Sequence, residues 1–130
     1  MIVVDASALV ESLLRLPAAE AVDERLFRVG EALHVPHLVD IEIVHALRRR
    51  LAAGQIEPAR CGEVLEDLSR LRLFRHPHGD LIPRVWELRN NLTAYDAIYV
   101  ALAELLDAPL LTRDRRIAAA PGHRAQVDLV

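Results

Sequence analysis

Residues 92–114, LTAYDAIYVALAELLDAPLLTRD, decide the fold because they join a helix to a strand. The first part is almost wholly apolar after its opening turn and predicts a helix over residues 94–106. Residues 110–112 predict a short buried strand. Asp96 lies at the start of the helix, and Asp114 lies just past the end of the strand. The stretch therefore predicts an α/β unit with a carboxylate at the edge of each element.

On either side of this stretch, short apolar runs alternate with helical patterns. Further strands are predicted at residues 2–4, 33–36, 73–75 and 126–130. Strands that alternate with helices are typical of an α/β fold around a mainly parallel sheet, here of four to five strands. No linker, repeat or low-complexity segment interrupts the pattern, so residues 1–130 are expected to form a single domain.

The helices are predicted from apolar spacing and from glycine or proline at their ends. They are expected over residues 7–15 and 18–29, from residue 38 to Gly54, from Pro58 onward, over residues 81–89 and 94–106, and briefly before the last strand. The longest of them is indicated by an apolar stripe with helical spacing; its members are Leu38, Ile41, Val44, Leu47 and Leu51.

Composition excludes several classes of protein. All 16 basic residues are arginine, so there is no lysine for a P-loop, a Schiff base or a receiver domain. The one cysteine, Cys61, cannot form an internal disulfide and is expected to be a packing residue, which suits the cytoplasm. No apolar run reaches the roughly 20 residues that a membrane span needs, and the N-terminus does not resemble a signal peptide.

The formal net charge of −3 provides no overall positive field to attract nucleic acid. Arginines nevertheless gather in two clusters, and the planar guanidinium suits bidentate contacts to phosphate. Each cluster is equally well explained as the solvated face of a helix. The first comprises Arg48, Arg49 and Arg50, and the second Arg113, Arg115 and Arg116.

Four acidic residues stand where strands end or helices begin: Asp5, Glu42, Asp96 and Asp114. In parallel sheets the ligand crevice lies beyond the carboxyl ends of the strands, where Asp5 and Asp114 are expected. Carboxylates a few ångströms apart cannot all stay ionised without a counter-charge. A divalent cation would supply it, and metal-assisted phosphodiester chemistry is therefore the leading hypothesis.

Asp5 and Glu42 also have purely structural explanations. Asp5 could cap the helix that follows it, although Ser7 could do the same. Glu42 could face solvent beside Arg49 or Arg50. Asp40 competes with Glu42 as the acidic residue of the site.

The other two acids have local alternatives as well. Thr93 and Asp96 have the spacing of a capping box, which closes a helix N-terminus without any ligand. Asp114 could pair with Arg115 or Arg116 in a surface ion pair of little energetic consequence. The six histidines show no metal-binding spacing, although His45 lies one turn after Glu42 and could share its helix face.

Four blocks of this sequence resemble the PIN-domain endoribonucleases, specifically the VapC-type toxins of bacterial toxin–antitoxin pairs. They are IVVDASALV, HVPHLVDIEIVHALRRR, LTAYDAIYVALAELLDAPLLT and TRDRRIA, which together run nearly end to end. The third block is the most specific. Two positions depart from relatives: His45 stands where asparagine is common, and Arg113 stands where smaller residues are common.

The resemblance implies a PIN-like α/β/α sandwich and Mg²⁺- or Mn²⁺-dependent cleavage of RNA. Its catalytic, metal-binding acids match Asp5, Glu42, Asp96 and Asp114, with Ser7 and Thr112 at hydroxyl positions that often line the pocket. It further implies a homodimer and a cognate VapB-type antitoxin that binds over the active-site groove. Asp5 and Asp96 are expected to be the primary ligands, with Glu42 and Asp114 completing the site through water or a second ion.

Two other functions are weighed against this one. A phosphatase with Asp5 as nucleophile would want a second aspartate two residues later, where this chain has Ser7. A catalytically inactive PIN-like scaffold could bind RNA or dimerise without cutting. Retention of all four acids argues against a scaffold, because an inactive binder gains nothing from clustered carboxylates.

Overall fold

The computed structural model describes residues 1–130 and is built on one parallel sheet. Its strands are β1 (Ile2–Val4), β2 (Leu33–Pro36), β3 (Leu73–His76), β4 (Leu110–Thr112) and β5 (Val127–Leu129). Their order is β3-β2-β1-β4-β5, and every neighbouring pair is parallel. The predicted α/β class, with a sheet of four to five strands, is confirmed.

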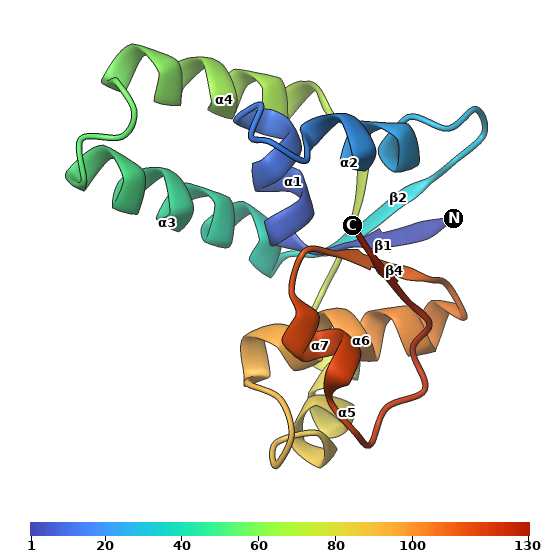
Figure 1. The fold of residues 1–130 in the computed structure, drawn as a ribbon. Coiled ribbons are helices and arrows are strands. Elements are labelled where there is room, and N and C mark those ends of the chain that lie inside the picture. Colours follow the sequence, from blue (N-terminus) through green and yellow to red (C-terminus); the bar gives the residue numbers. More distant parts are fainter.

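Helices cover both faces of the sheet, as Figure 1 shows. One layer holds α1 (Ala6–Leu13), α2 (Ala19–Leu26), α3 (Leu38–Ala52) and α4 (Pro58–Arg70). The other holds α5 (Ile82–Glu87), α6 (Ala94–Leu106) and α7 (Arg115–Ala119), with the short 3-10 helix η1 (Gly79–Leu81) preceding α5. None of these helices combines the length and the apolar character that crossing a bilayer requires.

The core lies around β1 and α6. All three residues of β1 are fully buried, as expected for a central strand covered on both faces. Helix α6 buries seven consecutive residues, from Ala97 to Ala103, between the sheet and α5. A helix that is buried around most of its circumference needs an unbroken apolar sequence, which this segment has. The most specific block of the sequence therefore forms the most enclosed helix.

Most predicted elements lie where expected, with shifted ends. The bounds of β1, β2, β4 and α6 agree with the prediction, whereas α1 and α2 are each shorter. The helix predicted over residues 81–89 begins as η1 and ends at Glu87.

The apolar stripe along α3 is only partly buried: Leu47 lies in the core and Leu38 packs against it. Ile41 is 67% exposed, and Val44 and Leu51 are also exposed. The buried row consists of Val39, Ile43 and Leu47. Because α3 carries apolar residues on two adjoining rows, spacing alone could not tell which row packs against α1, α4 and β2. The row that contains Ile41 and Val44 faces outward instead.

Candidate active site

Two of the four acids come from the ends of adjacent strands. Asp5 directly follows β1, and Asp114 lies two residues after β4. The two strands pair with Val4 opposite Leu111. From β1 the chain proceeds to β2 and β3 on one side, whereas β4 and β5 lie on the other, so this is the switch point of the sheet.

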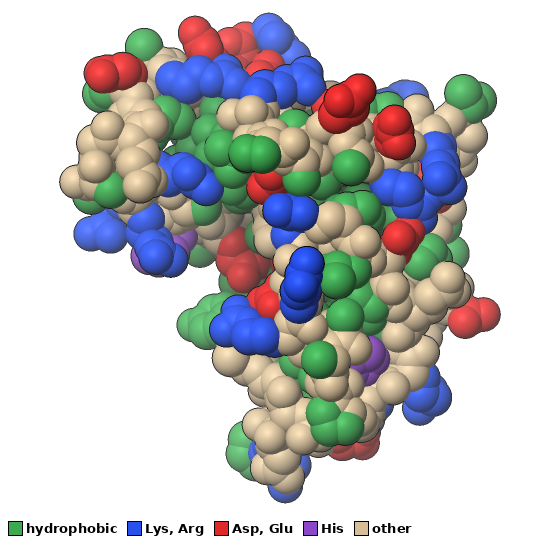
Figure 2. All heavy atoms as spheres, in the orientation of Figure 1, with side chains coloured by type: hydrophobic (Ala, Val, Ile, Leu, Met, Phe, Trp, Pro, Cys, Tyr) green, Lys and Arg blue, Asp and Glu red, His purple; other side chains and the backbone are tan.

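The other two acids come from helices of the two layers. Glu42 lies on α3, and Asp96 lies in the first turn of α6. All four acids line a single pocket of about 750 Å³. Figure 2 shows acidic side chains in the hollow between the two halves of the molecule, with arginines around it. The pocket is completed by Ala6, Ser7, Val10, Leu38, Ile41, His45, Ala46, Arg49, Tyr95 and Arg116.

Asp5 is a buried carboxylate without a basic partner. The residue is 6% exposed, and its Oδ2 accepts hydrogen bonds from Ser7 Oγ at 2.5 Å and Thr112 Oγ1 at 2.6 Å. Its side chain makes no capping hydrogen bond to α1, so the capping alternative is wrong. Burial raises the pKa of Asp5 above its ordinary value, although the two hydroxyl bonds oppose the shift. A nearby cation would therefore stabilise the ionised form of Asp5.

Hydroxyl groups tie the turn after β1 to the turn after β4. Thr112 is fully buried, and its Oγ1 accepts the backbone N–H of Asp114 at 3.0 Å while donating to Asp5. Ser7 Oγ accepts the backbone N–H of Arg113 at 3.0 Å. The two strand ends, and with them Asp5 and Asp114, are thereby held in one frame.

Glu42 is half-buried, and its carboxylate accepts a hydrogen bond from the hydroxyl of Tyr99. Burial raises the pKa of Glu42 to about 7, against an opposing effect of the Tyr99 bond; the charges of Asp5 and Asp96 add to the rise. The alternative of a solvent-facing glutamate paired with Arg49 or Arg50 is wrong.

Asp96 both closes its helix and lines the pocket. Its backbone N–H donates to Thr93 Oγ1 at 3.2 Å, and the Thr93 hydroxyl donates to Asp96 Oδ2 at 3.0 Å. The capping interaction predicted from the spacing is therefore present. Because Asp96 also lines the pocket, its capping role does not exclude a functional one.

Asp114 already has a cationic neighbour. Arg116 Nη2 lies 2.6 Å from Asp114 Oδ2, and the backbone N–H of Arg116 donates to Oδ1 at 2.8 Å. These bonds hold the pKa of the Asp114 carboxyl below its ordinary value. Of the two pairings considered, the one with Arg116 is present.

The donor chemistry fits a divalent cation, but the four side chains are not arranged as a finished ligand set. No group of three or more acidic, histidine or cysteine side chains is positioned to hold a metal ion. Each acid instead bonds to a hydroxyl or to Arg116. Carboxylate oxygens are the ligands that Mg²⁺ and Mn²⁺ prefer.

Several residues weighed from the sequence lie outside this arrangement. Asp40 accepts two hydrogen bonds from Arg75, at 2.7 and 2.9 Å, and does not line the pocket. Arg113 turns away, with its Nη1 donating to the carbonyl of Val130 at 2.5 Å. His45, by contrast, lines the pocket and is exposed.

Tyr99 is the residue that sequence reasoning missed. Its signal was a hydroxyl in an otherwise apolar helix, one turn after Asp96.

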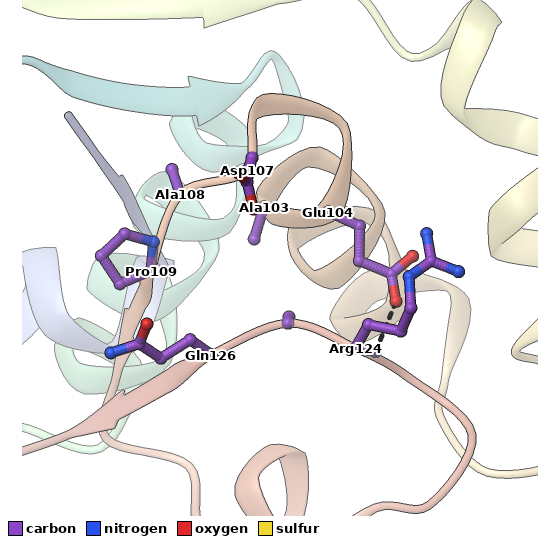
Figure 3. Close-up of a pocket in the computed structure, with 8 residues that line it drawn as sticks. Ala103, Glu104, Asp107, Ala108, Pro109, Arg124 and Gln126 are labelled. Carbon is purple, nitrogen blue, oxygen red and sulfur yellow. Dashed lines mark hydrogen bonds between the residues drawn. The ribbon is translucent and has the colours of Figure 1, made fainter.

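A second pocket, at the opposite end of α6, is separate from the acids (Figure 3). It is lined by Glu104 and Arg124, and the backbone N–H of Arg124 donates to Glu104 Oε1 at 2.7 Å.

Carboxylates gathered at the switch point of a parallel sheet, between two helical layers, define an α/β protein with an acidic ligand pocket. The chain belongs to the PIN-domain family, since the family profile described as PIN domain matches residues 2–122. Ribonuclease VapC1 of Mycobacterium tuberculosis is 44% identical, over 98% of this chain and 96% of that protein.

Solved structures agree with this membership. PAE2754 from Pyrobaculum aerophilum has a TM-score of 0.72 and 26% identity, over 99% of this chain and 83% of that one. VapBC2 from Rickettsia felis, bound to a DNA fragment from their promoter, has a TM-score of 0.73 over 99% of this chain and 98% of that one. Its identity of 14% limits the second likeness to the fold.

Proposed function

We propose that this chain is a divalent-metal-dependent endoribonuclease toxin that cleaves phosphodiester bonds of RNA. The observation that carries the proposal is Asp5, a buried carboxylate with hydroxyl partners and no basic one, in a pocket lined by three more acids. The 44% identity to a protein named a ribonuclease supports the RNA substrate. The pocket supports the metal dependence because its uncompensated charge favours a bound cation.

Asp5 and Asp96 are the primary ligands of Mg²⁺ or Mn²⁺ in this proposal. Glu42 and Asp114 complete the site through water or a second ion. A bound ion would supply a more acidic water and a counter-charge for the phosphate. The Ser7 and Thr112 hydroxyls hold the Asp5 carboxylate in place, and Thr93 holds that of Asp96.

Arg49 and Arg116 line the same pocket and are proposed to contact RNA phosphates. Guanidinium groups beside an acidic floor would hold the backbone of the substrate while the scissile phosphate lies over the carboxylates.

We further propose that the 130 residues act as one PIN domain, in the cytoplasm, as a homodimer that a cognate VapB-type antitoxin inhibits by covering the groove. Exposed apolar side chains beside the pocket support a protein-binding surface there. They are Ile41, Val44 and Tyr95.

An inactive PIN-like scaffold that binds RNA without cutting is the second candidate. The observation that favours it is that each acid already has a donor within the chain, and that Arg116 neutralises Asp114. Such a protein would bind RNA through its arginines and would not respond to metal.

A cleavage assay separates the two candidates. Mn²⁺ and Mg²⁺ are titrated against mixed cellular RNA with the wild-type chain, Asp96→Asn and Asp40→Asn. We expect discrete, metal-dependent products from the wild type and from Asp40→Asn, whose carboxylate lies outside the pocket, and none from Asp96→Asn. Uncut RNA with every folded protein would favour the scaffold, and cleavage by Asp96→Asn would reduce Asp96 to a helix cap.

A further inference from the structure

Tyr99 lies beneath the pocket and is the largest of the fully buried side chains. It stands on α6, three residues after Asp96, and therefore on the same side of the helix. Its hydroxyl donates a hydrogen bond to Oε2 of Glu42 on α3. A buried tyrosine hydroxyl needs a hydrogen-bond partner, and here the partner is an acid of the site.

This bond joins the two helical layers at the edge of the sheet, as the places of α3 and α6 in Figure 1 indicate. The carboxylates of Asp96 and Asp114 are held by Thr93 and Arg116, a few residues away in sequence. The single side-chain bond of Glu42 instead comes from a residue 57 positions away.

Glu42 has no other side-chain hydrogen bond. The neighbouring residues Ile41, Val44 and His45 are exposed, so the half-buried glutamate borders an open side of the pocket. Glutamate has three side-chain torsions and loses considerable freedom when it is fixed. Without the tyrosine hydroxyl, the carboxylate would be free to turn into solvent and away from Asp5 and Asp96.

We infer that Tyr99 is a positioning residue, whose hydroxyl holds the Glu42 carboxylate at the pocket so that Glu42 takes part in binding the divalent cation. The inference rests on the proposed function, since it concerns the same metal site. The phenyl ring alone accounts for the packing of Tyr99 in the core. The role assigned here belongs to the hydroxyl, which Tyr99→Phe removes while the ring remains.

Mn²⁺ binding measured by calorimetry without RNA tests the inference. Outer partners of metal ligands typically contribute about 10- to 100-fold in affinity, so Tyr99→Phe is expected to weaken Mn²⁺ binding by at least about 10-fold. Asp40→Asn is the control, because the Asp40 carboxylate bonds to Arg75 and lies outside the pocket. It is expected to bind Mn²⁺ as the wild type does.

A double variant shows whether the effect passes through Glu42. Glu42→Gln alone, and combined with Tyr99→Phe, are expected to have the same Mn²⁺ affinity, because the hydroxyl acts only on that carboxylate. In cleavage assays, Tyr99→Phe should raise the Mn²⁺ concentration needed for half-maximal rate, with a smaller effect on the rate at saturating Mn²⁺. Glu42→Gln keeps the size of the side chain and has an amide oxygen that can accept from the Tyr99 hydroxyl, so it provides this comparison without disturbing the core.

The outcomes separate the inference from the proposed function. Wild-type Mn²⁺ binding and cleavage with unchanged affinity in Tyr99→Phe would overturn the inference alone. Additive losses in the double variant would also overturn it, because Tyr99 would then act on something other than Glu42. A wild-type chain that neither binds Mn²⁺ nor cuts RNA would overturn the proposed function and the inference with it.

Discussion

At the scale of single residues, the four acids of the pocket differ in what balances their charge. Burial raises the pKa values of Asp5 and Glu42, whereas Arg116 lowers that of Asp114. Asp114 therefore remains ionised beside the Arg116 guanidinium. Asp5 and Glu42 are the acids whose ionised forms a bound cation would stabilise most. Arg116 already pairs with the Asp114 carboxylate, to which a metal ion would otherwise bind.

Arg116→Gln is expected to change metal and RNA binding in opposite directions. Mn²⁺ affinity should rise by only about 2- to 5-fold, because exposed ion pairs contribute little. RNA binding should weaken, and the slope of its logarithm against log salt should fall by about 1 as one phosphate contact is lost. Calorimetry with Mn²⁺ and RNA binding at several salt concentrations measure both effects.

Arg115→Gln is the control, since Arg115 is exposed and lies outside the pocket. It should leave Mn²⁺ affinity unchanged. Equal effects of the two substitutions would show that only the overall charge matters, and that the pairing of Arg116 with Asp114 has no role.

At the scale of elements, α6 links the site to the stability of the C-terminal segment. Its first turn holds Asp96, and its last turn holds Glu104 beside the second pocket (Figure 3). Glu104 accepts bonds from Arg84 Nε at 2.7 Å and Nη2 at 3.0 Å, and from the backbone N–H of Arg124. The Arg84 bonds are the main cause of its lowered pKa. One carboxylate thus connects α5, α6 and the segment before β5.

Glu104→Gln is expected to lower the free energy of unfolding by about 2–4 kcal/mol at pH 7, because it breaks a mostly buried ion pair. Glu87→Gln is the matched control: Glu87 bonds to the same Arg84 at 2.9 Å, but its side chain is 63% exposed. It should cost less than about 1 kcal/mol. Urea denaturation measures both, and equal losses would show that burial does not set the strength of these pairs.

The same two helices show how much the sequence could predict. The bounds of α6 follow from the sequence because Thr93 caps an unbroken apolar run, and both signals are local. The buried face of α3 does not, because Ile41 and Ile43 have the same hydrophobicity and only packing against α1, α4 and β2 distinguishes them. The edges of elements indicated Asp5, Asp96 and Asp114 as pocket candidates, whereas spacing alone left Glu42 and Asp40 as alternatives. The role of Tyr99 could not be predicted, because its bond spans 57 residues.

At the scale of the whole molecule, a net charge of −3 opposes RNA binding, and the chain has only arginine to offset it. Arg49 and Arg116 provide positive charge at the pocket, but the acids below them would still repel a phosphate. A bound cation would remove that repulsion. RNA binding at the proposed site is therefore expected to depend on metal even when no cleavage takes place.

The pocket acids also set the pH dependence of stability. For Glu42 the folded-state pKa, about 7, lies above the ordinary value of 4.5, so the folded protein binds the extra proton. This contribution is fully present below pH 4.5 and is lost as the pH rises through about 7. Asp5 acts in the same direction, since its pKa is also raised. Glu104 and Asp114, whose pKa values are lowered, act oppositely and lose their contribution only in acid.

In EDTA, the metal-free protein should therefore melt at a lower temperature at pH 8 than at pH 5.5. For Glu42, discounted for solvent on its open side, the loss is about 1–2 kcal/mol, or roughly 3–8 °C in Tm. Mg²⁺ should raise Tm at pH 8 and hardly at pH 5.5, because protons compete for the same carboxylates. Calorimetric melting at both pH values, with and without Mg²⁺, measures this. In Glu42→Gln, both the pH dependence of Tm and the rise of Tm with Mg²⁺ should be smaller, since the titrating ligand is gone. A wild-type Tm that is equal at the two pH values in EDTA would contradict the raised pKa values of the pocket acids.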